Sequence, residues 1–243
     1  LSGTRAAIYI DDSALVSNIN IMNGASLSGD IVSLWNPMAD RVQFYGEDGE
    51  RMEVPTQVTD ETVDKMVTHL TFGLKADETG ASIEETTDEN FYLSYTGNIY
   101  GSWDDYENKP VTAAVTMNVK GGELNFNGMA NVLSVTVDER ATLSGEGQYN
   151  LAVIGTLLEN ASGNDFDKFE IPLIFETYGN FVNNGTLSPG NGIGTMEING
   201  AFEMGEKGNV VIEFGADGTT DHLLIRDENL QTASDFREQV DLM

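Results

Sequence analysis

The stretch NFVNNGTLSPGNGIGTMEING, residues 180–200, indicates the fold class. Apolar residues alternate with polar ones along it, and asparagine–glycine steps interrupt the short runs. Alternation with a period of two is typical of strands that have one buried face, and Asn-Gly steps are typical of tight corners. The stretch contains no catalytic motif, metal-ligand cluster or phosphate-binding loop. It therefore predicts short, repeated β-strands joined by sharp turns.

Similar units recur elsewhere in the chain. The hexapeptides ASLSGD (residues 25–30), ATLSGE (141–146) and GTLSPG (185–190) resemble one another. An irregular period of about 20–25 residues is typical of a solenoid, in which one turn alone cannot bury its apolar side. We expect the glycines of the Asn-Gly steps to supply the positive φ of the corners. These steps begin at Asn23, Asn127, Asn184, Asn191 and Asn199. The prediction is an all-β parallel β-helix, and ordinary β-hairpins with type I′ turns are the alternative.

The pattern divides the chain into four parts. We expect β-helix rungs in residues 1–35, an elaboration inserted on the β-helix in 36–110, a β-helix stem in 111–230 and a terminal segment in 231–243. The elaboration holds most of the tyrosines. Within it, Thr59 is a candidate cap for a short helix whose apolar residues continue at helical spacing to Leu70. We expect strands to resume at residues 70–74 and 91–101.

Composition limits the possible partners. The chain has 40 Asp and Glu against 12 Lys and Arg, a net charge of −28, yet 40% of its residues are hydrophobic. This balance predicts a folded protein with an acidic surface. It argues against nucleic acid and anionic membranes as partners, since both need basic patches. No cysteine is present, so disulfides and thiol catalysis are excluded. No apolar run approaches the roughly 18–20 residues of a membrane helix, and no signal peptide opens the chain. Because the chain begins in the middle of the pattern with a strand, we expect a fragment of a longer protein.

Candidates for catalysis are few. His69 and His222 are the two histidines, and Asp221 precedes His222, but neighbouring strand residues point to opposite faces. The acidic pairs Asp11-Asp12 and Asp104-Asp105 would suit a glycan-cleaving β-helix enzyme only with partners from adjacent rungs. We expect His222 to lie at the rim of a β-helix corner and the paired aspartates to be solvated turn residues. We therefore predict no catalytic residue.

Two short acidic motifs raise the question of calcium. Residues 217–221 (DGTTD) and 165–167 (DFD) place oxygen ligands close together. Neither has the spacing of an EF-hand loop or the repeat of a calcium roll, and Asx turns explain both. We therefore expect no cofactor, with Ca²⁺ left as the open alternative.

An aromatic-rich stretch is the candidate partner surface. It comprises Tyr92, Tyr95, Tyr100, Trp103 and Tyr106, with acidic residues between them. Exposed aromatic rings are common where a surface module grips a protein or a sugar ring. The alternative is that these rings close the end of the apolar column or pack the elaboration onto it.

Several segments resemble the passenger region of bacterial autotransporters. The resemblance is carried by GGELNFNGMANVLSVTVDERATLSGEG (residues 121–147), by GTLSPGNGIGT (185–195) and by VIEF followed by DGTTDHLLI (211–214 and 217–225). Two earlier segments, INIMNGASLSGDIVSLW (19–35) and FYLSYTGNIYG (91–101), resemble stem segments that follow the protease domain in subtilisin-like members of that family.

The resemblance implies a right-handed parallel β-helix that is exported and held at, or released from, the outer-membrane surface. The protein would be a non-catalytic stem without direct membrane insertion, and its partners would be its own upstream passenger domain and a downstream translocator barrel. One corner would be shaped by Gly185, Leu187, Pro189, Gly190, Asn191, Ile193 and Gly194. The alternatives are an adhesin that binds a host protein or glycan through residues 36–110 and, third, a glycan-active enzyme.

Overall fold

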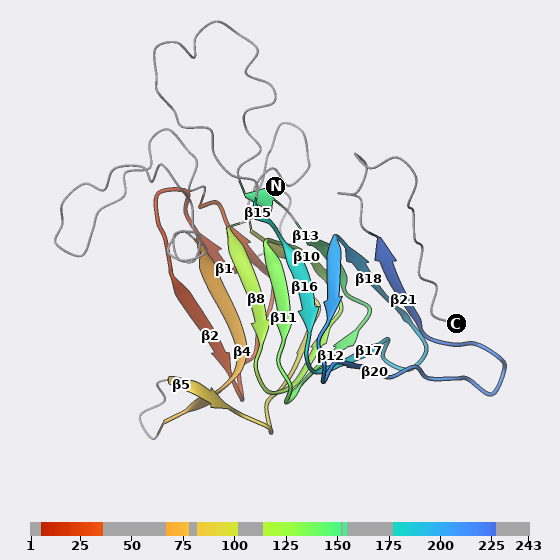
Figure 1. The fold of residues 1–243 in the computed structure, drawn as a ribbon. Helices are drawn as coiled ribbons and strands as arrows, with labels where there is room; N and C mark the ends of the chain where they lie inside the picture. Colours follow the sequence, from red (N-terminus) through yellow and green to blue (C-terminus); the bar gives the residue numbers. More distant parts are fainter. Residues whose placement is uncertain are drawn as a thin grey trace, which may run out of the picture.

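The computed structural model describes residues 6–35, 67–77, 82–101, 114–151, 153–154 and 177–226. Within these ranges the protein is all-β, without a helix, and its strands form three parallel sheets (Figure 1). The first sheet contains β1 (Ala6–Ile10), β3 (Asp30–Ser33), β7 (Ile99–Tyr100), β10 (Met129–Val132), β13 (Gln148–Leu151), β18 (Thr195–Asn199) and β21 (His222–Arg226). The second contains β2 (Asn18–Met22), β4 (Thr68–Ala76), β8 (Val115–Val119), β11 (Ser134–Val137), β16 (Asn180–Asn183) and β19 (Ala201–Met204). The third contains β6 (Tyr92–Tyr95), β9 (Gly122–Phe126), β12 (Ala141–Gly145), β17 (Thr186–Pro189) and β20 (Asn209–Val210).

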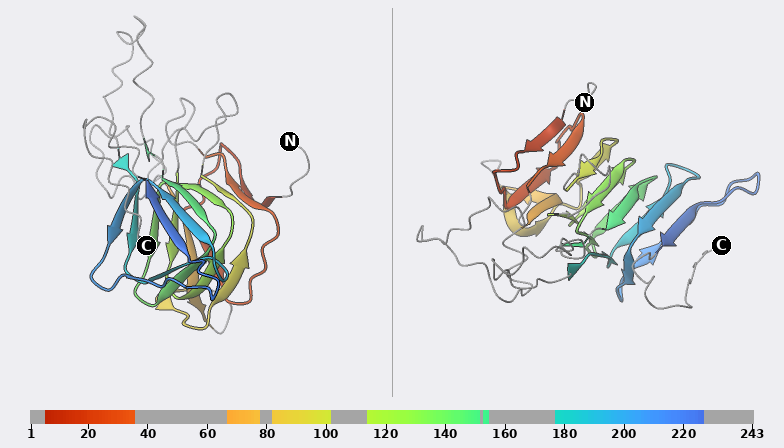
Figure 2. Two further views of the ribbon diagram at one scale, coloured as in Figure 1. Left: turned by 90° about the vertical axis from the view of Figure 1, so that its right-hand side faces the viewer. Right: turned by 90° about the horizontal axis from the view of Figure 1, so that it is seen from above.

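The order of strands in each sheet follows their order in the sequence. From β8 onward the chain visits the second, third and first sheets in turn, and then repeats the same circuit. Figure 2 shows the successive strands lying side by side from the N-terminal to the C-terminal end. Two antiparallel pairs lie outside this scheme, β5 (Ser82–Thr87) on β4 and β14 (Val153–Ile154) with β15 (Thr177–Tyr178). The arrangement is consistent with a parallel β-solenoid, because neighbouring strands along the order of each of the three sheets pair in parallel and antiparallel pairing between described strands is confined to the two pairs just named.

A leucine ladder shows why the sequence folds this way. Leu93, Leu124, Leu143 and Leu187 occupy matching register positions on neighbouring strands of the third sheet. All four side chains point inward and are buried, whereas the residues on either side of each are less buried or face outward. Burying one such side chain stabilises the fold by about 1.5–3 kcal/mol relative to exposure. Because each leucine needs a neighbour above and below, the gain is realised only when the strands stack.

Aromatic rings form a second column through the core. Tyr95, Phe126, Tyr149, Phe181 and Phe202 follow one another with ring centroids 5.9, 5.6, 5.3 and 5.8 Å apart. These separations are those of favourable tilted and edge-to-face pairs. The rings come from all three sheets, so the column packs the sheets against one another. Its first ring belongs to β6, inside residues 36–110, and β4, β6 and β7 of that segment are members of the three sheets.

The structure corrects two expectations of local geometry. Leu70 lies in β4, which contains the strand expected at residues 70–74, and not in the expected helix, because it pairs in parallel with Met117 of β8; residues 59–66 lie outside the described ranges. The glycines of the Asn-Gly steps also have two different roles. Gly24 has a φ of +84° as predicted, whereas Gly128 is not among the positive-φ glycines. A Cβ on Gly128 would lie 2.1 Å from the carbonyl oxygen of Gly97, so that position requires glycine for space.

Candidate functional site

The predicted corner begins in the third sheet. Leu187 is fully buried in the core, and Pro189 is in register with Gly145 on the neighbouring strand. Gly190, at a φ of +84°, donates its N–H to the oxygen of Gly145 (2.9 Å) and accepts from the nitrogen of Gly145 (3.2 Å). A Cβ on Gly185 would lie 2.3 Å from a backbone oxygen of the preceding coil. These residues therefore tie two coils together through backbone contact.

The corner then turns towards the first sheet. The amide of Asn191 donates from Nδ2 to Oδ1 of Asn127 (2.9 Å). Ile193 is 40% exposed, so it does not contribute to the core. The N–H of Gly194 donates to Oδ1 of Asp221 (3.0 Å), a residue 27 positions later in the chain. The corner is a structural junction, since the polar contacts described in it join backbone groups, amide side chains and the carboxylate of Asp221 within the fold.

The aromatic candidates do not form one surface. Tyr92 is 58% exposed on the third sheet, and Tyr100 is half-buried on the first sheet. Tyr95 is 1% exposed, so the expectation of an exposed ring is wrong for this residue. It is the first ring of the core column because strand alternation turns it inward. Trp103 and Tyr106 lie outside the described residues.

The acidic residues of the first calcium candidate are occupied by hydrogen bonds. Asp217 accepts from the nitrogen (3.1 Å) and Oγ1 (2.6 Å) of Thr219 in an Asx turn, and these bonds lower its pKa. Asp221 is buried; its Oδ1 accepts from Gly194 and its Oδ2 accepts from the nitrogen of Glu213 (2.7 Å). Asp221 therefore fastens the long connection before β21. No group of three metal-ligating side chains is found in the described part of the chain.

The catalytic candidates are dispersed. Asp11 accepts from the nitrogen (3.2 Å) and Oγ (2.8 Å) of Ser13, a local turn. His69 shares a 3.0 Å hydrogen bond between Nδ1 and Oγ1 of Thr116. His222 is exposed whereas Asp221 is buried, so the two side chains separate as neighbouring strand residues do. The segments 104–105 and 165–167 lie outside the described residues.

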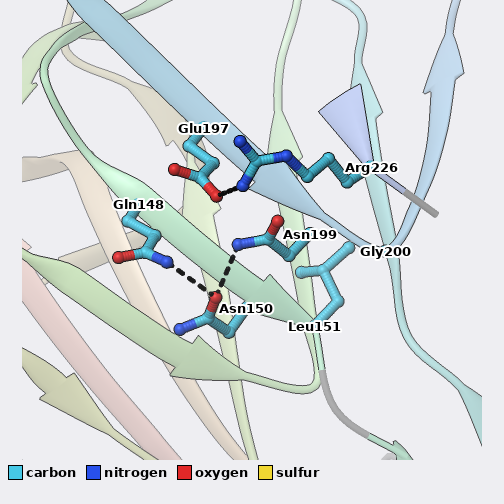
Figure 3. A pocket seen from close by; sticks show the side chains of 7 residues that line it. All are labelled: Gln148, Asn150, Leu151, Glu197, Asn199, Gly200 and Arg226. Carbon is cyan, nitrogen blue, oxygen red and sulfur yellow. Dashed lines mark hydrogen bonds and ion pairs between the residues drawn. The ribbon is translucent and has the colours of Figure 1, made fainter. Parts of the chain in front are cut away.

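A shallow depression of about 370 Å³ lies on the outer face of the first sheet (Figure 3). It spans β13, β18 and β21, because strand alternation points every second side chain of these strands outward. The lining consists of Gln148, Asn150, Leu151, Glu197, Asn199, Gly200 and Arg226. The depression therefore presents mainly amides and one ion pair, and its one apolar side chain, Leu151, is 9% exposed.

Amide side chains follow one register position across this face. Asn131, Asn150 and Asn199 are paired on neighbouring strands. Asn150 Nδ2 donates to Oδ1 of Asn131 (2.7 Å), and Asn199 Nδ2 donates to Oδ1 of Asn150 (2.8 Å). Gln148 adds a longer bond from Nε2 to the same oxygen of Asn150 (3.4 Å). We call these four residues the amide column, whose mutual bonds hold the planar groups in fixed orientations.

The charges at the depression cancel. Arg226 donates from an Nη atom to an Oε atom of Glu197. The side chain of Glu197 is 24% exposed and that of Arg226 is 47% exposed. A pair this open contributes about 0–1 kcal/mol to stability, so its main effect is to remove net charge from the lining.

Sequence reasoning missed the amide column. A signal for it exists, since Asn131 and Asn150 are 19 residues apart, the same interval that separates Asn125 from Ser144 in the next sheet. Each asparagine also follows an inward-pointing residue, which places it on the outer face. Asn199 escapes this reasoning because 49 residues separate it from Asn150.

Comparison with known proteins identifies no relative: no family model, no curated protein and no solved structure matches this chain. In the described ranges no helix is long and apolar enough to cross a membrane.

Proposed function

We propose that this chain is the non-catalytic stem of an autotransporter passenger, a right-handed parallel β-helix at the extracellular face of the outer membrane. Its role is to act as a spacer that displays an upstream domain. The downstream partner is a translocator barrel, from which the stem emerges and folds coil by coil.

One observation supports this proposal above the others. In all three sheets the spatial order of the strands is their order in the sequence. Each coil then finds its template in the coil next to it in the chain, which allows folding to propagate from one end. Backbone pairing and burial of the leucine and aromatic columns supply the driving force at each step.

Right-handedness rests on a general rule of strand connection. Parallel strands of one sheet that are joined by a crossover are right-handed in about 98% of cases, because the right-handed twist of strands favours that return. Experimental coordinates that trace the path from the second sheet through the third to the first would test this part of the proposal.

The stem function has a direct cellular test. The chain is placed between a reporter domain and a translocator barrel and is expressed in a Gram-negative host. We expect the reporter to become accessible to external protease. A matched variant with Leu143→Asp, which places a charge in the leucine ladder, should lose display because the coil cannot close. Equal display by both versions would contradict the proposal.

An adhesin is the second candidate, favoured by the exposed ring of Tyr92. Deleting all of residues 36–110 would remove β4, β6 and β7, and would therefore confuse loss of binding with loss of folding. The sharper test replaces residues 36–66 with a short glycine–serine linker and separately makes Tyr92→Ala. Loss of host-cell binding with unchanged display would favour the adhesin.

A further inference from the structure

The amide column offers hydrogen-bonding groups that the fold does not use. Oδ1 of Asn150 already accepts from Gln148 and Asn199. In contrast, Oε1 of Gln148 and Oδ1 of Asn199 accept no hydrogen bond from another described residue. The side-chain amides of Gln148 and Asn199 also keep a second N–H each, since each donates only one hydrogen bond within the amide column. The depression thus presents donors and acceptors side by side, and both types are held in place by Asn150.

Charge excludes ionic ligands. The carboxylate of Glu197 is paired with Arg226, and no second carboxylate lines the depression. A divalent cation would therefore find too few anionic oxygens. An anionic ligand would approach a protein of net charge −28 and would meet only a cation that is already paired. A neutral ligand fits this lining.

The position and lining of the depression narrow the class of neutral ligand further. The backbone groups of β13 and β18 are used in the sheet, because each strand is paired on both sides. A peptide cannot add there as a strand, and recognition must come from side chains. Leu151 lines the depression only with its 9% exposed edge, since it belongs to the core, and it packs beside Gly200, where a Cβ would lie 2.7 Å from Cβ of Leu151. A lining made mainly of amide groups, which can both donate and accept, matches the hydroxyl groups of a sugar ring.

We propose that the depression formed by β13, β18 and β21 binds a neutral, extended oligosaccharide. The hydroxyl groups donate to Gln148 Oε1 and Asn199 Oδ1 and accept from their free N–H groups. Because the amides repeat with the strand spacing of about 4.8 Å, the sugar chain runs across the strands along the solenoid axis. The volume of about 370 Å³ is at the small end of ligand sites, so only one or two rings are held at a time.

Binding here occurs without cleavage. Glycoside hydrolysis ordinarily uses two carboxyl groups on either side of the scissile bond, and the lining provides only Glu197. Sugar binding at the depression requires the three-sheet fold but not the stem function. A failed display experiment would therefore not argue against sugar binding, and a failed binding experiment would not argue against the stem function.

The test uses the full chain and three uncharged probes, maltohexaose, cellohexaose and laminarihexaose. Saturation-transfer NMR and backbone amide shifts are recorded during titration. We expect at least one probe to bind with a Kd on the order of 1 mM, and to shift amide signals of β13, β18 and β21. Gln148→Ala and Asn199→Ala should each raise the Kd about three- to tenfold, since each removes one or two hydrogen bonds.

Asn180→Ala is the matched control, because Asn180 is exposed on β16 of the second sheet and away from the depression. It should leave the Kd unchanged. Circular dichroism of every variant checks the fold. If a variant unfolds, the amide signals that shift in the unmodified protein decide whether the probe binds at the depression. No binding by any probe up to about 20 mM, shifts confined to another sheet, or equal loss in the control would overturn the proposal. So would tighter binding at the depression of hexagalacturonate or of an uncharged Ser/Asn peptide.

Discussion

Replacing Tyr149 with phenylalanine should stabilise this protein. Tyr149 is fully buried, with its ring between Phe126 at 5.6 Å and Phe181 at 5.3 Å. Its Oη atom is buried and has no hydrogen-bond partner among the described residues. The substitution Tyr149→Phe keeps the ring in the aromatic column and removes only this hydroxyl.

The magnitude follows from the cost of an unsatisfied buried hydroxyl, which is about 1–3 kcal/mol. A small void left by the lost oxygen offsets part of the gain, so we expect an increase of about 1 kcal/mol in the free energy of unfolding. Tyr95→Phe is the matched control. Tyr95 Oη donates to the carbonyl oxygens of Gly29 (2.9 Å) and Asn98 (3.2 Å), so its loss should destabilise by about 0.5–1.5 kcal/mol.

The two tyrosines also predict a pH dependence. Burial raises the pKa of Tyr149 above its ordinary value, and burial followed by the charge of Asp30 does the same for Tyr95. A raised folded pKa means that the unfolded phenol ionises first. Below about pH 10 both states keep the phenol protonated, so ionisation does not lower the free energy of unfolding. As the pH rises from there towards the folded pKa, only the unfolded state ionises, and the free energy of unfolding falls. Tyr149→Phe should therefore reduce the alkaline loss of stability by up to about 1.4 kcal/mol per pH unit above pH 10.

Urea unfolding followed by far-ultraviolet circular dichroism, at about pH 8 and about pH 11, measures both effects. The expected result is opposite signs for the two phenylalanine variants at the lower pH. A loss of stability in Tyr149→Phe equal to that in Tyr95→Phe would refute the reasoning, because it would show that the Tyr149 hydroxyl is satisfied.

The same unfolding assay checks three further predictions. Leu143→Ala should lower the free energy of unfolding by about 2–5 kcal/mol, since it opens a cavity in the middle of the leucine ladder; a loss under about 1 kcal/mol would contradict that packing. Asp221→Asn should cost about 1–3 kcal/mol, because one of its two backbone N–H donors loses its acceptor, and unchanged stability would argue against its fastening role. Gly128→Ala should cost more than Gly24→Ala: the first places a Cβ 2.1 Å from a carbonyl oxygen, and the second meets open space and adds only about 1–2 kcal/mol of backbone strain. The reverse order would show that the corner at Gly128 can relax.

Local patterns were enough to predict the class of fold. Alternation in the run after Asn180 indicates strands, and β16, β17 and β18 are found there. The recurrence of ATLSGE (residues 141–146) and GTLSPG (185–190) indicates stacking, and the leucines of these two units, Leu143 and Leu187, are buried in register on β12 and β17. Such features depend on residues close in the chain, where the period of the side chains directly states which face is buried.

Partners that are far apart in the sequence could not be predicted in this way. The sequence around Leu70 fits the end of a helix as well as the start of a strand, and pairing with Met117 decides for the strand. Tyr95 was a candidate surface residue, yet it stands at 5.9 Å from Phe126 in the core column. In both cases the decisive contact comes from another coil.

What the sequence alone determined is therefore the strand-and-corner character of the chain, the recurrence of similar units and the acidity of its surface. Only the tertiary structure decided which strands are neighbours, which tyrosine lies inside and that Asn150 meets Asn199, which is 49 positions later in the chain. The physical reason is that parallel strands pair between coils whose separation in the chain varies. The register of these strands therefore depends on how the buried columns fit together, and no local sequence period can predict it.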